Sequence, residues 1–85
     1  MPRYLDIHKN LGKVTMKDLD EAHQKDLKVQ DKYGVNFVRY WLDEKGETAF
    51  CLSIAPNREA PVNCHRASHG LLPDEVYEVT EGGAV

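Results

Sequence analysis

Apolar and polar residues alternate along this chain with two periods, and the changes between them mark six elements. Around Leu5 and Ile7 the period is two, which is typical of a strand, whereas after Thr15 apolar residues recur every three to four positions, as in an amphipathic helix. Turn residues and stretches rich in β-branched and aromatic side chains add further boundaries. Together these patterns predict strands at 3–9, 36–42, 48–55 and 75–80, and helices from 15 to about 33 and from 58 to 69.

Several residues fix where these elements begin and end. Thr15 followed three positions later by Asp18 is a variant of the capping box that opens a helix, and Gly34 supplies the left-handed residue that closes it. Pro56 ends the third strand, and Asn57 can cap the second helix. The third strand is the most apolar, so we expect it to lie in the interior of the sheet.

The resulting order, β-α-β-β-α-β, predicts an α+β protein of the ferredoxin-like type. In this arrangement two crossovers place both helices on one face of a four-stranded antiparallel sheet. We therefore expect one ferredoxin-like domain over residues 1–80 and a flexible C-terminal tail over 81–85.

The first strand has two chemically different faces. We expect Leu5 and Ile7 to lie under the helices, which leaves Tyr4, Asp6 and His8 on the open face of the sheet. A half-apolar open sheet in so small a domain commonly packs against a second copy. The sequence thus predicts a homodimer through the open face, an assembly of the dimeric α+β barrel type.

Composition excludes several classes of partner. The net charge of −3 and the pI near 5.7 argue against nucleic acid, and no apolar run is long enough to span a membrane. The first residues lack the pattern of a signal peptide, and two cysteines are too few for a disulfide framework. We expect a cytoplasmic protein with reduced thiols.

His65 and His69 are the most distinctive chemical feature. Histidines four apart share a helix face, so both can reach one zinc, copper or nickel ion. The helical phase places Cys64 on the core side with Ala60 and Ala67, and places the two histidines on the far side. A site there would lie at the surface and would borrow further ligands from a loop, water or another subunit.

Two other polar groups are candidates for a site. Asp26 lies in the middle of the apolar stripe of the first helix, with His23 beside it. Its carboxylate either accepts hydrogen bonds from His23, the backbone or a tyrosine, or it lines a pocket with a raised pKa as an acid or base. Asp6 and His8 share a strand face and form either a surface or interface ion pair or a binding site for one ion or ligand.

Taken together, the motifs resemble a family of small ferredoxin-like bacterial domains of unknown function that includes a nickel-responsive, nickel-binding member. The resemblance implies a βαββαβ fold, a dimer through the sheet, divalent-metal binding in at least one member and no known catalytic activity. It covers nearly the whole chain, and the matching motifs are Tyr4-Leu5-Asp6-Ile7-His8, Asp26-Leu27, Gln30-x-Lys32-Tyr33-Gly34-Val35, Arg39-Tyr40-Trp41, Phe50-Cys51-Leu52, Ala55-Pro56, His65-x-x-x-His69-Gly70-Leu71 and Pro73-Asp74-Glu75.

Three functions follow from these residues. The favoured one is a non-enzymatic protein that buffers or senses nickel or another divalent transition metal, held by His65 and His69 and joined by His8, Asp6 or His23. The alternative is a small dimeric α+β barrel enzyme, similar to monooxygenases or isomerases, with a small-molecule cavity lined by Tyr4, Asp6, His8, Asp26 and Trp41. The third is an interaction module in which the histidines are incidental.

Overall fold

The computed structural model describes residues 1–83 and contains the six expected elements in the expected order. The strands are β1 (Arg3–His8), β2 (Asn36–Asp43), β3 (Thr48–Ile54) and β4 (Glu75–Val79), and the helices are α1 (Met16–Tyr33) and α2 (Glu59–Ser68). The predicted tail at 81–85 has no regular structure at 81–83, and residues 84 and 85 lie outside the described residues.

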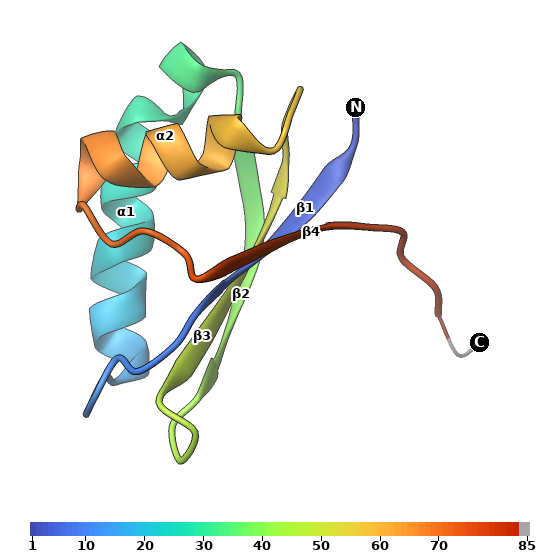
Figure 1. The fold of residues 1–85 in the computed structure, drawn as a ribbon. Coiled ribbons are helices and arrows are strands. Elements are labelled where there is room, and N and C mark those ends of the chain that lie inside the picture. Colours follow the sequence, from blue (N-terminus) through green and yellow to red (C-terminus); the bar gives the residue numbers. More distant parts are fainter. Residues whose placement is uncertain (84–85) are drawn as a thin grey trace.

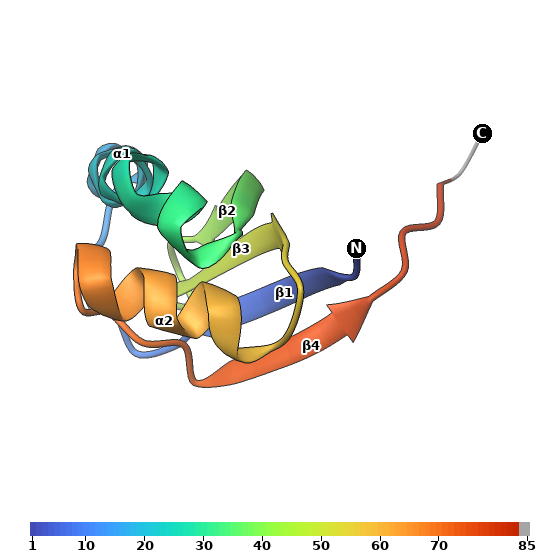
Figure 2. The same cartoon turned by 90° about the horizontal axis from the view of Figure 1, so that it is seen from above.

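The strands form one antiparallel sheet in the order β2-β3-β1-β4, so β3 lies in the interior as expected. Both helices cover the same face of this sheet, and the opposite face is bare (Figures 1 and 2). The ferredoxin-like α+β fold is therefore confirmed. No helix among residues 1–83 is long and apolar enough to cross a membrane.

Local sequence accounts for the ends of α1. The Thr15 side chain accepts a hydrogen bond from the backbone N–H of Asp18, and the Asp18 side chain accepts one from the backbone N–H of Thr15, which completes the capping box. Gly34 adopts a left-handed φ of 68° and ends the helix, a conformation that a side chain would strain. At the other helix, the Asn57 side chain accepts a hydrogen bond from the backbone N–H of Ala60, as its predicted capping role requires.

The apolar core occupies one end of the space between helices and sheet. It combines side chains from β1, β2 and α2 with residues of the connecting loops, and its buried members are Tyr4, Val35, Phe37, Ala55, Ala60 and Cys64. Further along β1, the same space is filled by polar side chains, beginning with Asp6 and His8. The fold thus places a small hydrophobic core directly beside a buried polar cluster.

The predicted orientation of β1 is wrong. Tyr4, Asp6 and His8 are the buried residues of this strand and face the helices, whereas Leu5 and Ile7 are only partly buried on the opposite face. Burying Asp6 and His8 is tolerated because they hydrogen-bond to each other and Asp6 also contacts a side chain of α2, so their polar atoms are satisfied.

The predicted phase of α2 is also wrong in part. Cys64 is buried as expected, but His65 is buried beside it and Ala67 is exposed. The helix is rotated so that Cys64 and His65 both face inward, because carboxylates of β1 and α1 lie where they can pair with the His65 ring.

Candidate metal centre

His65 is the centre of a buried polar cluster built from β1, α1, β3 and α2. Its side chain is 1% exposed and lies between two carboxylates. The Nε2 atom is 3.0 Å from Oδ2 of Asp6, and the Nδ1 atom is 3.1 Å from Oδ1 of Asp26. The two ring nitrogens thus face two separate groups of donor atoms.

The first group surrounds Asp6. His8 Nε2 is 2.8 Å from Asp6 Oδ1, and Cys51 on β3 is the direct cross-strand partner of Asp6. One donor atom from each of Asp6, His8, Cys51 and His65 lies within 4.8 Å of all the others. This group offers one carboxylate, two imidazoles and one thiol.

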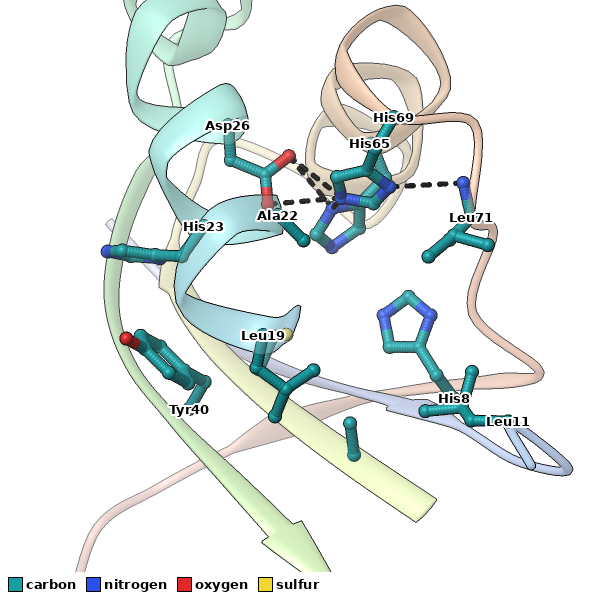
Figure 3. Close-up of a pocket in the computed structure, with 12 residues that line it drawn as sticks. His8, Leu11, Leu19, Ala22, His23, Asp26, Tyr40, His65, His69 and Leu71 are labelled. Atoms are coloured by element: carbon teal, nitrogen blue, oxygen red, sulfur yellow. Dashed lines mark hydrogen bonds and ion pairs between the residues drawn. The ribbon is translucent and has the colours of Figure 1, made fainter. Parts of the chain in front are cut away.

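The second group surrounds Asp26 (Figure 3). Its carboxylate accepts a hydrogen bond from Ser68 Oγ at 2.6 Å. Its Oδ2 atom lies 3.3 Å from Nε2 of His69. One donor atom from each of Asp26, His65 and His69 likewise lies within 4.8 Å of the other two, close enough for all three to reach one ion. The orientation of the His69 ring is also fixed on its other side, where Nδ1 accepts a hydrogen bond of 3.1 Å from the backbone N–H of Leu71.

Charges in the cluster are strongly coupled. Burial alone would lower the pKa of His65, but hydrogen bonds to Asp26 and Asp6 outweigh it and raise that pKa to about 9. Burial alone would raise the pKa values of Asp6 and Asp26, but hydrogen bonds from the histidines hold both below their ordinary value. In the metal-free protein, His65 is therefore an imidazolium between two carboxylates.

Two expectations about Asp26 need correction. Its pKa is lowered, where the pocket hypothesis called for a raised one, because three donors stabilise the ionised form. Those donors are His65, Ser68 and His69, and not His23, the backbone or a tyrosine. Its place in the middle of the apolar stripe of α1, which left its burial open, proves to be a buried position.

A cavity of about 40 Å³ opens beside the cluster, between α1 and the sheet. His8, Cys51, Asp26, His65 and His69 contribute to its wall. The remaining wall is formed mainly by apolar side chains together with two aromatic rings, and consists of Leu11, Leu19, Ala22, His23, Tyr40, Ala49 and Leu71.

The expected lining of a cavity is thus right for His8 and Asp26 and wrong for two aromatic residues. Tyr4 belongs to the apolar core, and Trp41 is 44% exposed in a separate hollow on the open face of the sheet. Asp6 is 0% exposed and lies behind His8 and His65, within the cluster but not on the cavity wall.

His23 lies apart from both donor groups found among residues 1–83. Its ring packs against Tyr40 with 4.7 Å between ring centres, at the side of the cavity away from His65 (Figure 3). Burial lowers its pKa. The structure therefore brings together His65, His69, His8 and Asp6 of the predicted ligands and leaves His23 outside.

Sequence reasoning missed the placement of Cys51 and Ser68. The strand pattern predicts only that Cys51 lies within the strand at 48–55, and none of the motifs predicts a role for Ser68. The spacing of Asp6 and Cys51 carries no local signal, because they meet only through the register of β1 with β3. Ser68 lies three residues after His65 on α2, a spacing that would have placed both on one helix face.

The fold and this cluster define a class: small ferredoxin-like proteins with histidine, carboxylate and thiol donors buried beneath the two helices. The profile of the family described as nickel responsive protein SCO4226-like matches residues 4–79, so the chain belongs to this family. The crystal structure of SCO4226 from Streptomyces coelicolor A3(2) is similar, with 33% sequence identity and a TM-score of 0.88 over 95% of this chain and 99% of that chain. No curated protein sequence gives a significant match.

The donor chemistry of the cluster fits the metal that the family description implies. Imidazole nitrogens, carboxylate oxygens and a thiol are ligands for nickel, zinc and copper, whereas magnesium and calcium prefer oxygen alone. The converging donors come from four elements of the fold and are nearly all withdrawn from water.

Proposed function

We propose that this protein binds a divalent transition metal of the nickel type at the His65 cluster and serves in buffering or sensing that metal. The observation that carries the proposal is the position of His65, a buried ring whose two nitrogens each face a carboxylate and further donors. One residue thus belongs to both donor groups.

Charge balance supports a divalent ion. Asp6 and Asp26 contribute two negative charges to a site that is almost closed to solvent, and in the metal-free protein only the His65 proton is held between them. A bound divalent ion would place positive charge beside these carboxylates in place of that proton. Because the ion and the His65 proton compete for the same ring, binding is reversible and weaker at low pH, which suits buffering or sensing.

Titration calorimetry of Ni²⁺ and Zn²⁺ into the purified protein tests the proposal. We expect one ion per chain in the wild type, binding weakened at least tenfold in His65→Gln, and unchanged affinity in His23→Ala, a histidine outside both donor groups. Circular dichroism verifies that each variant is folded.

A measurement on the wild type alone covers the case in which His65→Gln does not fold. Ni²⁺ is paramagnetic and broadens NMR signals of nearby nuclei, so the ring signals of His65 should disappear at lower Ni²⁺ than those of His23. Equal broadening of both rings, or no binding by the wild type, would show that the cluster is not a metal centre.

The enzymatic alternative has one observation in its favour, the cavity against His8 and Asp26. Its volume of about 40 Å³ exceeds the roughly 10–15 Å³ that one water needs, but it accepts only a ligand of a few non-hydrogen atoms. Few substrates are that small, whereas the two donor groups can hold any of several divalent transition metals. Metal binding therefore remains the preferred function.

A further inference from the structure

The hydrogen bonds of the cluster distinguish between its two donor groups. We propose that the ion binds on the Nε2 side of His65, where Asp6, His8 and Cys51 are its other ligands and Cys51 contributes a thiolate. Asp26, Ser68 and His69 are then positioning residues that orient His65 and do not touch the ion. This inference rests on the proposed metal-binding function and names the side and chemistry of its site.

The first argument is the tautomer of His69. A backbone N–H can only donate, so His69 Nδ1, which accepts the N–H of Leu71 at 3.1 Å, carries no proton. The ring must then carry its proton on Nε2, which lies 3.1 Å from His65 Nδ1 and 3.2 and 3.3 Å from the two oxygens of Asp26. Because His65 is an imidazolium whose Nδ1 is itself an N–H, the His69 proton is donated to the carboxylate. His69 Nε2 therefore has no lone pair to offer an ion unless the bond to Leu71 is broken.

The second argument is that Asp26 is already saturated with donors. The Ser68 hydroxyl donates to it at 2.6 Å, His69 donates from Nε2, and His65 Nδ1 lies 3.1 Å away. A carboxylate that accepts the second N–H of a histidine is the usual device that fixes the ring orientation of a metal ligand and strengthens its other nitrogen as a donor. Asp26 is such a carboxylate, because it accepts the Nδ1–H of His65 and leaves Nε2 to face the ion.

The third argument is the set of donors around His65 Nε2. With Nδ1 donating to Asp26, the Nε2 lone pair is free for an ion that replaces the proton now held towards Asp6 at 3.0 Å. His8 Nε2 and the Cys51 sulfur lie in the same space, one beside Asp6 on β1 and one opposite it on β3. His8 Nε2 donates to Asp6, but no hydrogen bond from residues 1–83 holds its Nδ1, so the His8 ring, unlike that of His69, can carry its proton on Nδ1 and offer Nε2 to the ion. Four donors converge there, against three on the Asp26 side.

A thiolate ligand has a chemical consequence. Burial raises the pKa of the Cys51 thiol, so the thiol is neutral in the metal-free protein. As the ion binds, the thiol and His65 Nε2 each release one proton to solvent, and no electron is transferred. Thiolates favour softer ions, so the site should prefer Ni²⁺, Zn²⁺ or Cd²⁺ strongly over Mg²⁺ or Mn²⁺.

Absorption spectroscopy of the Ni²⁺- and Co²⁺-loaded protein tests the proposal, because thiolate ligation produces a sulfur-to-metal charge-transfer band in the near ultraviolet. We expect the band in the wild type and its loss in Cys51→Ser. Cys64→Ala removes the other thiol, which lies in the apolar core, and should keep the band. A wild type that binds Ni²⁺ through His65 without such a band overturns this inference and leaves the proposed function intact.

Variants of the positioning residues supply the second arm. Asp26→Asn and His69→Ala should lower the affinity for Ni²⁺ roughly ten- to a hundredfold while the charge-transfer band of the loaded protein stays in place. Loss of binding in His69→Ala with full affinity in Cys51→Ser would assign the ion to the Asp26 side. Absence of any Ni²⁺ binding by the wild type would refute both the inference and the function on which it rests.

The tautomer can also be measured without metal. Long-range ¹H–¹⁵N NMR of the metal-free protein should show His69 unprotonated at Nδ1 and protonated at Nε2. The opposite tautomer would leave a lone pair on Nε2, which could then bind the ion, and would contradict the proposal.

Discussion

His65 shows how one residue connects three elements of the fold. Its ring joins α2 to Asp6 on β1 and to Asp26 on α1, and all three side chains are withdrawn from water. Removing one partner of such a buried charge cluster leaves the others uncompensated, which typically costs about 3–5 kcal/mol. The cluster therefore makes the metal-free fold dependent on the ionisation of a single histidine.

This dependence predicts how the stability of the metal-free protein changes with pH. The pKa of His65 is raised from 6.5 to about 9 in the folded state, so its stabilisation is complete below pH 6.5 and disappears as the pH rises through about 9. Melting temperatures measured by circular dichroism should fall between pH 6.5 and 9. Each 1 kcal/mol lost lowers the melting temperature of a domain this size by roughly 4–8 °C. A flat profile over this range would contradict the buried imidazolium.

At the scale of elements, α1 depends on its capping box for a defined start. Thr15 and Asp18 satisfy one another's backbone N–H groups at a helix end that carries no other side-chain cap. The cap lies more than two helical turns from Asp26, so it stabilises the helix without contacting the cluster.

Thr15→Ala should therefore destabilise the protein by about 1 kcal/mol through loss of the N-cap. Chemical denaturation measures this change, and titration with Ni²⁺ should give the wild-type affinity. Thr48→Ala, a substitution of the same kind at the start of β3, is a matched control for helix-specific loss. Weakened metal binding in Thr15→Ala would mean that the geometry of the cluster depends on the N-terminal cap of α1.

At the scale of the whole molecule, the bare face of the sheet exposes apolar side chains that no element of residues 1–83 covers. Leu5, Phe50 and Leu52 line a hollow there, with Trp41 44% exposed at the same site. The inverted orientation of β1 adds Leu5 and Ile7 to this face and makes it more apolar than the sequence predicted. We propose that two copies pair through it.

Sedimentation velocity tests this pairing. We expect a dimer for the wild type and a shift to monomer for Trp41→Lys, because a charge on the face would be buried without a partner. Met16→Lys, a similar change at an exposed apolar residue of α1, should leave the dimer unchanged. A monomeric wild type would contradict the proposal.

Metal binding should also stabilise the molecule as a whole, because the donors come from several elements and come together only in the folded chain. At a free Ni²⁺ concentration one hundred times the dissociation constant, the gain is about 2.7 kcal/mol. Thermal melting should shift upwards with Ni²⁺ and scarcely at all with Mg²⁺, which prefers oxygen ligands. Equal shifts with both ions would indicate a non-specific effect of charge.

The sequence by itself determined the elements and their order. Thr15, Asp18 and Gly34 act within a few residues of their own positions, so the ends of α1 follow from local chemistry. The same holds for the strand periods, and the βαββαβ order then leaves few topologies to consider. The sequence also determined that His65 and His69 lie about one helical turn apart at the C-terminal end of α2, where His69 is the C-cap, and that Asp26 lies in the apolar stripe of α1.

Only the tertiary structure decided which way these faces turn. A period-two strand has two faces, and nothing within β1 states whether Leu5 or Asp6 is buried. That choice depends on His65, which is 59 residues away along the chain from Asp6 and 39 from Asp26. Hydrogen bonds between such distant residues make burial of the polar face favourable, and they exist only once the helices pack on the sheet.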